Sequence, residues 1–267
     1  MHCCGRLLWA FVMLKKRLIG VITVKDGWAV QSFGYRRYLP LGHPECLAEN
    51  LDRWGADEIL VLCIDCSRQG LGPDLSLLKR LNALGLSTPL TYGGGIRTVE
   101  QASLVIRSGA ERLCVDAALR TDRQAIRDMA ALLGAQALIA ALPLCMESRR
   151  VSWYDYRSGQ SVPLAESDFS LFADGVISEA LVIDWRHEGQ PNGFDMSLVH
   201  LFPFDGVPLI TFGGLSDPAQ LAMLLALPRV AAVGVGNFLS YSEHAVQTFK
   251  QQLTEMPLRP AAYAADY

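Results

Sequence analysis

The segment Pro89-Leu-Thr-Tyr-Gly-Gly-Gly-Ile96 is repeated, with changes, as Pro208-Leu-Ile-Thr-Phe-Gly-Gly-Leu215. Each copy predicts a short apolar strand, then a glycine turn, then the start of a helix. Self-similarity of this kind, in a chain where strands and helices alternate, indicates two related halves. We therefore predict a closed (β/α)8 barrel, the TIM-barrel fold, with a half-barrel internal repeat.

The rest of the chain supplies the strands that such a barrel needs. Short apolar runs bounded by turn residues predict eight strands, near residues 17–24, 58–64, 90–93, 112–115, 137–142, 180–184, 209–212 and 230–235. Thr98 and Asp217 are strong helix-start signals, because their short polar side chains can accept hydrogen bonds from the first turn. Residues 147–163, with the aromatic cluster Trp153-Tyr-Asp-Tyr156, predict a hairpin over the barrel mouth.

The composition agrees with one large soluble-type domain. The 267 residues match the roughly 250 that a barrel needs, and 51% are hydrophobic. We expect an N-terminal extension at 1–12, one barrel domain at 13–255, and a C-terminal tail at 256–267. Met13 is a candidate for the true start of the chain, in which case the extension is an artefact of the assigned start site. The net charge of −3 predicts no nucleic-acid partner.

Location and cofactors follow from the same composition. The apolar stretch 7–14 is far shorter than the roughly 20 residues that cross a bilayer, so no membrane partner is expected. Seven cysteines in an unpatterned set indicate reduced thiols and a cytoplasmic protein. Cys63 and Cys66 have redox or zinc spacing, but on an extended strand their thiols would diverge. We predict no metal and no cofactor.

The glycine turns are candidate phosphate-binding sites. Gly94, Gly95, Gly213 and Gly214 lack Cβ atoms, so backbone N–H groups there could approach an anion ahead of a helix. Gly236 and the side chain of Asn237 add donors beside the second turn. The alternative is that these glycines only make tight turns between strand and helix. Both interpretations stay open at this point.

From Met13 to about Leu253 the chain resembles the cyclase subunit of imidazole glycerol phosphate synthase, an enzyme of histidine biosynthesis. The matching stretches are Val24-Lys-Asp-Gly27, Gly55-Ala-Asp-Glu58, Tyr92-Gly-Gly-Gly-Ile-Arg-Thr-Val-Glu100, Gly109-Ala-Glu-Arg112, Gly193-Phe-Asp195 and Gly213-Gly214. The resemblance implies a barrel that receives ammonia from a glutaminase (glutamine amidotransferase) partner at its lower face.

The residues that the resemblance makes catalytic are missing. The family uses two aspartates, at the C-terminal ends of strands one and five, as general acid and base. The matching positions hold Thr23 and Pro143, and neither side chain exchanges a proton near neutral pH. Strand alternation gives an inward upper layer of Thr23, Leu62, Gly93, Asp116, Pro143, Ile183, Phe212 and Val235. Asp116 and His187 are therefore the weak catalytic candidates that remain.

Asp116 also bears on anion binding. It stands where the family places a neutral amide facing one phosphate, and an ionised carboxylate there would repel that anion. The second cup, with Gly213, Gly214, Gly236 and Asn237, keeps its open donors. We therefore expect one anion cup, not two. His187 with Glu188 is a further possible pair at the mouth, or a solvated loop histidine.

The lower end of the barrel matches the family better. Arg17, Glu58, Arg112 and Glu179 fall at the starts of strands and match the family's ammonia gate, with arginine in place of lysine at 112. Above them, the side chains of residues 19, 21, 60, 62, 181 and 183 predict an apolar lumen. Neutral ammonia would tolerate such a lining, whereas ammonium would not. The alternative is a charged plug that only seals the base.

Three functional hypotheses follow. The first is a barrel without the family's acid–base pair that conducts ammonia for amidation of a surface-polysaccharide sugar. Relatives of the cyclase in bacterial surface-polysaccharide (lipopolysaccharide) clusters act in acetamidino-sugar formation, and a sugar amidotransferase would then be a further partner. The second is a genuine cyclase in histidine biosynthesis with relocated acid–base groups. The third is a non-catalytic barrel that binds its partner without conducting anything.

Overall fold

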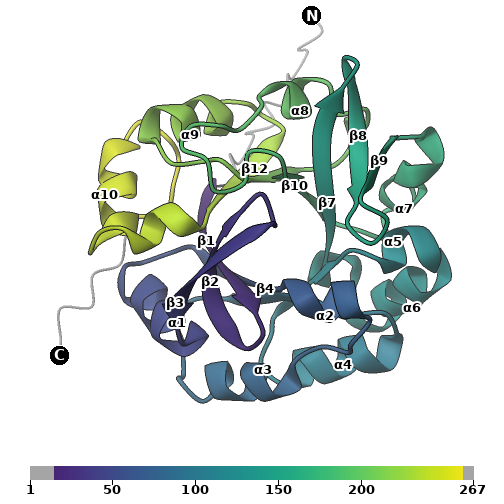
Figure 1. Ribbon diagram of the computed structural model, residues 1–267, viewed down its shortest axis with the longest axis horizontal. Helices are drawn as coiled ribbons and strands as arrows, with labels where there is room; N and C mark the ends of the chain where they lie inside the picture. The colour runs from purple at the N-terminus through teal and green to yellow at the C-terminus, as the bar shows by residue number, and fades with distance from the viewer. Residues whose placement is uncertain (1–14, 261–267) are drawn as a thin grey trace, which may run out of the picture.

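The computed structural model describes residues 15–260, and these form a closed parallel barrel wrapped by helices (Figure 1). The barrel strands follow in chain order as β1 (Arg17–Lys25), β4 (Glu58–Cys63), β5 (Leu90–Gly93), β6 (Arg112–Val115), β7 (Leu138–Glu147), β10 (Glu179–Asp184), β11 (Leu209–Phe212) and β12 (Val230–Val235). Each pairs in parallel with its neighbours, and the pairings β10 with β7 and β12 with β1 close the circle. The predicted TIM-barrel fold is confirmed.

Helices alternate with these strands. They are α1 (Pro44–Arg53), α2 (Ile64–Gln69), α3 (Leu75–Asn82), α4 (Val99–Arg107), α5 (Ala118–Thr121), α6 (Arg123–Leu133), α7 (Ser170–Ala173), α8 (Ser197–His200), α9 (Pro218–Leu225) and α10 (Ala245–Gln252). The predicted start signals are correct: Thr98 accepts a hydrogen bond from the backbone of Gln101 in a capping box, and Asp217 accepts one from Ala219.

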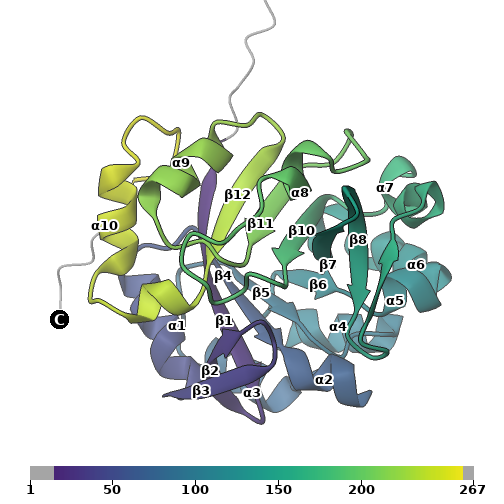
Figure 2. The same cartoon turned by 45° about the horizontal axis from the view of Figure 1, so that its top comes forward.

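Two hairpins extend from the barrel strands at the mouth (Figures 1 and 2). The first, β2 (Trp28–Phe33) with β3 (Arg37–Gly42), continues antiparallel from β1 and lies across the mouth in Figure 1. The second, β8 (Arg150–Asp155) with β9 (Gln160–Pro163), pairs with the extended end of β7. The sequence predicted the second hairpin and missed the first.

The barrel separates two hydrophobic clusters. The larger one lies between the strands and the helices, and it includes Leu18, Ile59 and Val182. The smaller one, which we call the lumen cluster, fills the inside of the barrel with Ile19, Val21, Leu60, Leu62, Cys114, Ile139, Ala141, Leu181, Ile183, Ile210, Phe212 and Ala232. All six side chains predicted to line the lumen belong to it.

One residue that was predicted to face the inside of the barrel faces outward. Val235 was placed in the upper inward layer, but it packs in the outer cluster between strands and helices. The register between β11 and β12 shifts at Leu209 and Ile210, so that Val230 and Ala232 are successive partners. A one-residue bulge moves every later side chain to the opposite face of the strand. Ala232 therefore faces inward, and Val235 faces outward.

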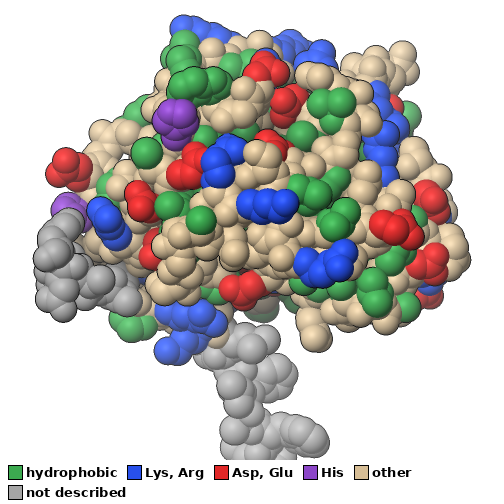
Figure 3. All heavy atoms as spheres, turned by 90° about the horizontal axis from the view of Figure 1, so that it is seen from below, with side chains coloured by type: hydrophobic (Ala, Val, Ile, Leu, Met, Phe, Trp, Pro, Cys, Tyr) green, Lys and Arg blue, Asp and Glu red, His purple; other side chains and the backbone are tan. Residues whose placement is uncertain are grey.

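The surface shows no large patch of one charge in the view of Figure 3, and the chain ends lie mostly outside the described residues. Basic and acidic side chains are interspersed on the face shown in Figure 3. Among residues 15–260, no helix has the length and apolar character needed to cross a membrane. The predicted extension at 1–12 lies outside the described residues, as does most of the predicted tail, of which only 256–260 are described.

Candidate functional site at the two ends of the lumen

The base of the lumen holds a closed ring of ion pairs, here called the charge ring: Arg17, Glu58, Arg112 and Glu179. Arg17 contacts Glu179 directly and lies 3.4 Å from a Glu58 oxygen, Nη1 to Oε2. Arg112 Nη1 lies 2.6 Å from Glu179 and 3.7 Å from Glu58. The four predicted residues are thus brought together, with signs alternating around the circle.

Neighbouring groups hold the charge ring in place. Glu58, whose side chain is 4% exposed, also accepts a hydrogen bond from the Thr91 hydroxyl at 2.5 Å. Arg112 donates to the Gln136 carbonyl at 3.1 Å and to the Ser178 hydroxyl at 3.2 Å. Buried charges are tolerated when they pair and use their remaining hydrogen-bonding capacity. The arrangement therefore fits either a sealed base or a gate that opens by breaking one ion pair.

Above the charge ring, the lumen cluster leads to a cavity at the mouth. This mouth cavity has a volume of about 790 Å³. Its apolar floor is shared with the top of the lumen, through Leu62, Ala141 and Ile183. The side chain of Tyr35, from the β2–β3 turn, packs on the lumen cluster from above. The apolar lumen cluster and the mouth cavity therefore lie next to each other along the barrel.

Thr23 and Pro143, which the resemblance predicts to stand in place of two aspartates, lie near the mouth. Thr23 is 5% exposed near the end of β1, where it is paired with Leu62. Pro143 lines the mouth cavity from β7 and is paired with Ile183. A hydroxyl and a proline ring can position a ligand, but neither can act as acid or base at neutral pH.

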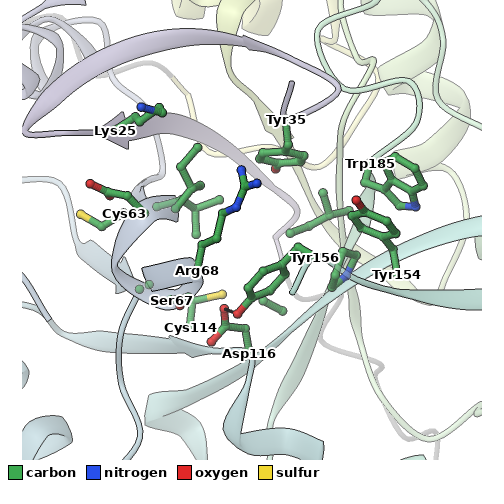
Figure 4. A pocket seen from close by; sticks show the side chains of 18 of the residues that line it. Lys25, Tyr35, Cys63, Ser67, Arg68, Cys114, Asp116, Tyr154, Tyr156 and Trp185 are labelled. Carbon is green, nitrogen blue, oxygen red and sulfur yellow. Dashed lines mark hydrogen bonds between the residues drawn. The ribbon is translucent and has the colours of Figure 1, made fainter. Parts of the chain in front are cut away.

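Asp116 is the acid of the predicted upper layer, and it does line the mouth cavity. The Tyr156 hydroxyl donates a hydrogen bond of 2.8 Å to its carboxylate, as the dashed line in Figure 4 shows. Burial raises the pKa of the Tyr156 hydroxyl, and the negative charge of Asp116 raises it further. Tyr156 therefore stays protonated and acts as a fixed donor to Asp116.

His187, the second candidate, is not brought into this cavity. Its Nδ1 lies 2.8 Å from Asp184 Oδ2, and the backbone N–H of Asp195 also donates to that oxygen at 2.8 Å. Burial raises the pKa of the Asp184 carboxyl, although these two contacts oppose the shift. The predicted pair of His187 with Glu188 is wrong, because Glu188 turns away and binds Ser32 Oγ at 2.9 Å.

The glycines of the two turns are required by close backbone neighbours. A Cβ on Gly94 would lie 2.4 Å from the Cys63 carbonyl oxygen, and one on Gly213 would lie 2.6 Å from that of Asp184. Gly95 and Gly214 meet neighbouring backbone atoms at 2.6 and 2.7 Å in the same way. These contacts explain the glycines as tight turns, whether or not an anion binds there.

The second predicted cup is closely filled. Gly213, Gly214, Gly236 and Asn237 surround a space of about 10 Å³, together with Phe212 and Glu188 among others. Such a volume holds about one water molecule. A phosphate there requires the side chain of Phe212 or Glu188 to move, so phosphate binding by these residues stays a prediction.

The cysteine pair differs from its prediction. Cys63 ends β4 and α2 begins at the next residue, so Cys66 lies on a helical turn instead of an extended strand. Both thiols are buried in the outer cluster and contact each other; the hydrogen bond to Cys66, together with burial, raises the pKa of Cys63. The expected divergence was therefore wrong. No group of three metal-ligating side chains occurs among the described residues.

The mouth also holds residues that the sequence did not single out. Tyr35, Arg36 and Tyr38 come from the unpredicted hairpin, and Arg68 comes from the short helix α2. Trp185 directly follows β10 and stacks on Tyr154 of the predicted hairpin, with ring centroids 3.8 Å apart. The aromatic segment 153–156 was the one sequence signal for this wall.

Comparisons with known proteins agree with this geometry. Residues 17–245 match the family described as histidine biosynthesis protein, so the chain belongs to that family. The imidazole glycerol phosphate synthase subunit HisF of Symbiobacterium thermophilum is 30% identical, over 91% of this chain and 96% of its own. The proteins of the same name from Anoxybacillus flavithermus and Pyrococcus furiosus are 28% and 29% identical, over 91% and 92% of this chain and 98% and 99% of theirs.

Proposed function

We propose that this chain is an ammonia-conducting barrel that pairs with a glutamine amidotransferase at its lower face. The ammonia would be used to amidate a surface-polysaccharide sugar. A separate sugar amidotransferase would carry out this amidation. The observation that carries the proposal is the charge ring beneath a continuous apolar lumen, with Thr23 and Pro143 where the family has its acid and base. These features support a barrel that passes ammonia on without performing the family's proton transfers.

The lumen supports passage of a neutral molecule. Its walls are aliphatic from Ile19 and Leu181 near the ring to Leu62 and Ile183 at the mouth. An ammonium ion would lose its hydration there without gaining a partner, whereas ammonia loses far less. Arg17 and Arg112 already pair with Glu58 and Glu179, so the charge ring would offer an ammonium ion no unpaired carboxylate at the entrance.

The test is an isotope competition. The chain is combined with the glutaminase and the sugar amidotransferase of its own organism, and supplied with [15N-amide]glutamine and excess unlabelled ammonium. Conduction predicts amidated sugar with more 15N than the bulk ammonia pool contains. An Arg17→Ala variant should bring the enrichment close to that of the bulk, and Arg112→Lys, which keeps the charge, should retain it. Enrichment equal to the bulk with the unmodified chain would contradict conduction.

A second candidate function is cyclisation itself, which the relatives named as synthase subunits favour. Asp116, already hydrogen-bonded to Tyr156 in the mouth cavity, would then be the proton-transfer group. The direct measurement is turnover of the histidine-pathway bisphosphate intermediate with saturating ammonium at high pH and no partner. Turnover that disappears in Asp116→Asn would establish this function. Absence of turnover would exclude it and leave the conducting or the purely partner-binding barrel.

A further inference from the structure

Two buried thiols lie next to each other where β4 meets α2. Cys63 is the last residue of β4 and the N-cap of α2, and Cys66 lies in the first turn of that helix. In a helical turn, Cα atoms three residues apart are separated by about 5 Å, which falls within the separation that a disulfide bond needs. The Cys63 thiol is hydrogen-bonded to Cys66. The early start of the helix therefore pairs two thiols that an extended strand would have kept apart.

The thiol pair is enclosed, with one member nearer to solvent. Cys63 is 1% exposed and borders the mouth cavity, but its sulfur points away from that cavity, into the layer between strands and helices (Figure 4). Cys66 is 8% exposed. A small reagent from solvent therefore reaches Cys66 first, and Cys63 is the thiol behind it.

A buried hydroxyl donates to the same pair. The Tyr92 hydroxyl accepts the Asp74 N–H at 2.7 Å and is hydrogen-bonded to both thiols. The hydrogen bond from Cys63 lowers the pKa of the Cys66 thiol, although burial and two nearby carboxylates oppose this shift. Cys66 is therefore the thiol that ionises more readily, and it is the more nucleophilic member of the pair near neutral pH.

We propose that Cys63 and Cys66 form a reversible disulfide, in which Cys66 reacts first with a peroxide and Cys63 closes the bond. The Cys66 thiolate attacks one peroxide oxygen, the O–O bond breaks, and the departing hydroxide takes up a proton to give water. The Cys63 sulfur then attacks the sulfenic acid on Cys66, whose hydroxyl leaves with the Cys63 proton as a second water. The two thiols lose two electrons and the peroxide gains them. A dithiol reverses the reaction by exchange.

A disulfide fits this pair better than a metal site does. Structural zinc takes four ligands, and among residues 15–260 no group of three metal-ligating side chains occurs. The S–S bond would also fix α2 against the end of β4, and the Ser67 hydroxyl of α2 accepts the Gly95 N–H at 3.0 Å. This inference goes beyond the proposed function and does not depend on it, because the thiols lie outside the lumen.

The test is peptide mapping of the whole folded chain after treatment with hydrogen peroxide, with the remaining thiols then alkylated in denaturant. Trypsin, which cleaves after Arg53 and Arg68, releases residues 54–68, which contain both cysteines and no third. This peptide should lose two hydrogen atoms and take up no alkylating reagent, and a dithiol should restore both thiols. If both thiols of the peptide are still alkylated when the exposed Cys46 has been oxidised, the proposal is overturned.

Variants assign the two roles. In Cys63→Ala, the sulfenic acid on Cys66 has no partner and should be captured by dimedone. In Cys66→Ala, capture at Cys63 should be roughly tenfold lower, because that thiol is more buried and ionises less readily. Cys114→Ala removes a buried lumen thiol outside the pair and is the matched control, in which the disulfide should form as in the unmodified chain. Equal capture in the first two variants would overturn the assignment of roles.

Discussion

The side chain of Asn237 and the backbone of Ser32 exchange two hydrogen bonds. Asn237 Nδ2 donates to the Ser32 carbonyl at 2.7 Å, and the Ser32 N–H donates to Asn237 Oδ1 at 3.2 Å. Asn237 follows β12, the neighbour of β1 in the barrel, so this amide fastens the β2–β3 hairpin to the end of that neighbouring strand. Glu188 adds a second attachment, since it binds Ser32 Oγ and its carbonyl accepts the Gly34 N–H at 2.9 Å. The amide that the sequence assigned to phosphate binding thus holds a hairpin over the cavity.

Replacing this amide should loosen the hairpin. Asn237→Ala leaves the Ser32 N–H and carbonyl buried without partners, which should lower the free energy of unfolding by about 1–3 kcal/mol. Amide hydrogen exchange across residues 28–42 should accelerate more than exchange in the barrel strands. Asn237→Asp sets a buried carboxylate against the Ser32 carbonyl oxygen, so it should accelerate this exchange at least as much. Unchanged exchange in Asn237→Ala would show that the attachment is dispensable.

Glu188 predicts a pH-dependent contribution to stability. Burial raises the pKa of its carboxyl, against opposing hydrogen bonds from Ser32, Tyr35 and Gly34. A carboxyl with a raised pKa in the folded state holds its proton more tightly than in the unfolded chain. Its stabilising contribution is therefore present below the ordinary pKa of about 4.3 and is lost as the pH rises through the folded-state value.

Glu188→Gln removes that titration. Relative to the unmodified protein, its free energy of unfolding should increase steadily between about pH 4 and pH 7, because the neutral amide has no charge to bury. Urea unfolding at several pH values in that interval measures the difference. The exposed Glu111→Gln is the control and should show no such trend. A difference that is constant with pH would contradict the assignment to Glu188.

The sequence predicted which side chains face the lumen wherever the strands alternate regularly. It failed where the direction of a side chain depends on pairing with a distant segment. Strand alternation correctly grouped Ile19, Leu60 and Leu181, and the resemblance to the cyclase family correctly grouped the four residues of the charge ring. The bulge that turned Val235 outward leaves no residue signature in β12, because it depends on pairing with β11.

The residues of the mouth cavity were also hard to predict, because distant segments bring them together. Its cationic residue Arg68 comes from a helix that begins directly after Cys63, and that early start also invalidated the strand argument about Cys66. The residues Trp28, Val30 and Phe33, which are of types common in strands, are followed by Gly34 and would have indicated the first hairpin. Nothing local indicates that its tip, with Tyr35, reaches across the barrel to Trp185.

The glycine turns give a prediction with an internal control. Gly213 has φ +103°, and an added Cβ would meet the Asp184 carbonyl oxygen at 2.6 Å. Gly159 also has positive φ, +73°, but has nothing within 4 Å of such a Cβ. Both changes to alanine incur the roughly 1–2 kcal/mol of a left-handed L-residue. Gly213→Ala should cost clearly more, as measured by urea unfolding, because the backbone of β10 must move. If the two changes lower the free energy of unfolding equally, the contact between Gly213 and the Asp184 carbonyl does not constrain the side chain at position 213.

The last prediction concerns a buried ion pair outside the mouth. Lys250 Nζ lies 2.8 Å from Asp57 Oδ1, with side chains 5% and 2% exposed, and the other Asp57 oxygen accepts the Leu18 N–H at 2.7 Å. This pair joins α10 to the entrance of β4 and the first residues of β1. Lys250→Met leaves a buried carboxylate unpaired, so the free energy of unfolding should fall by about 3–5 kcal/mol.

A double-mutant cycle separates the pair from its surroundings. Lys250→Met combined with Asp57→Asn should cost less than the sum of the two single changes, because no uncompensated charge is then buried. The exposed pair Arg127–Asp174 is the matched control, and Arg127→Met should cost no more than about 1 kcal/mol. If Lys250→Met costs as little as Arg127→Met, the carboxylate of Asp57 is not held by Lys250, and the attachment of α10 must rest on apolar contacts such as those of Val246 and Phe249.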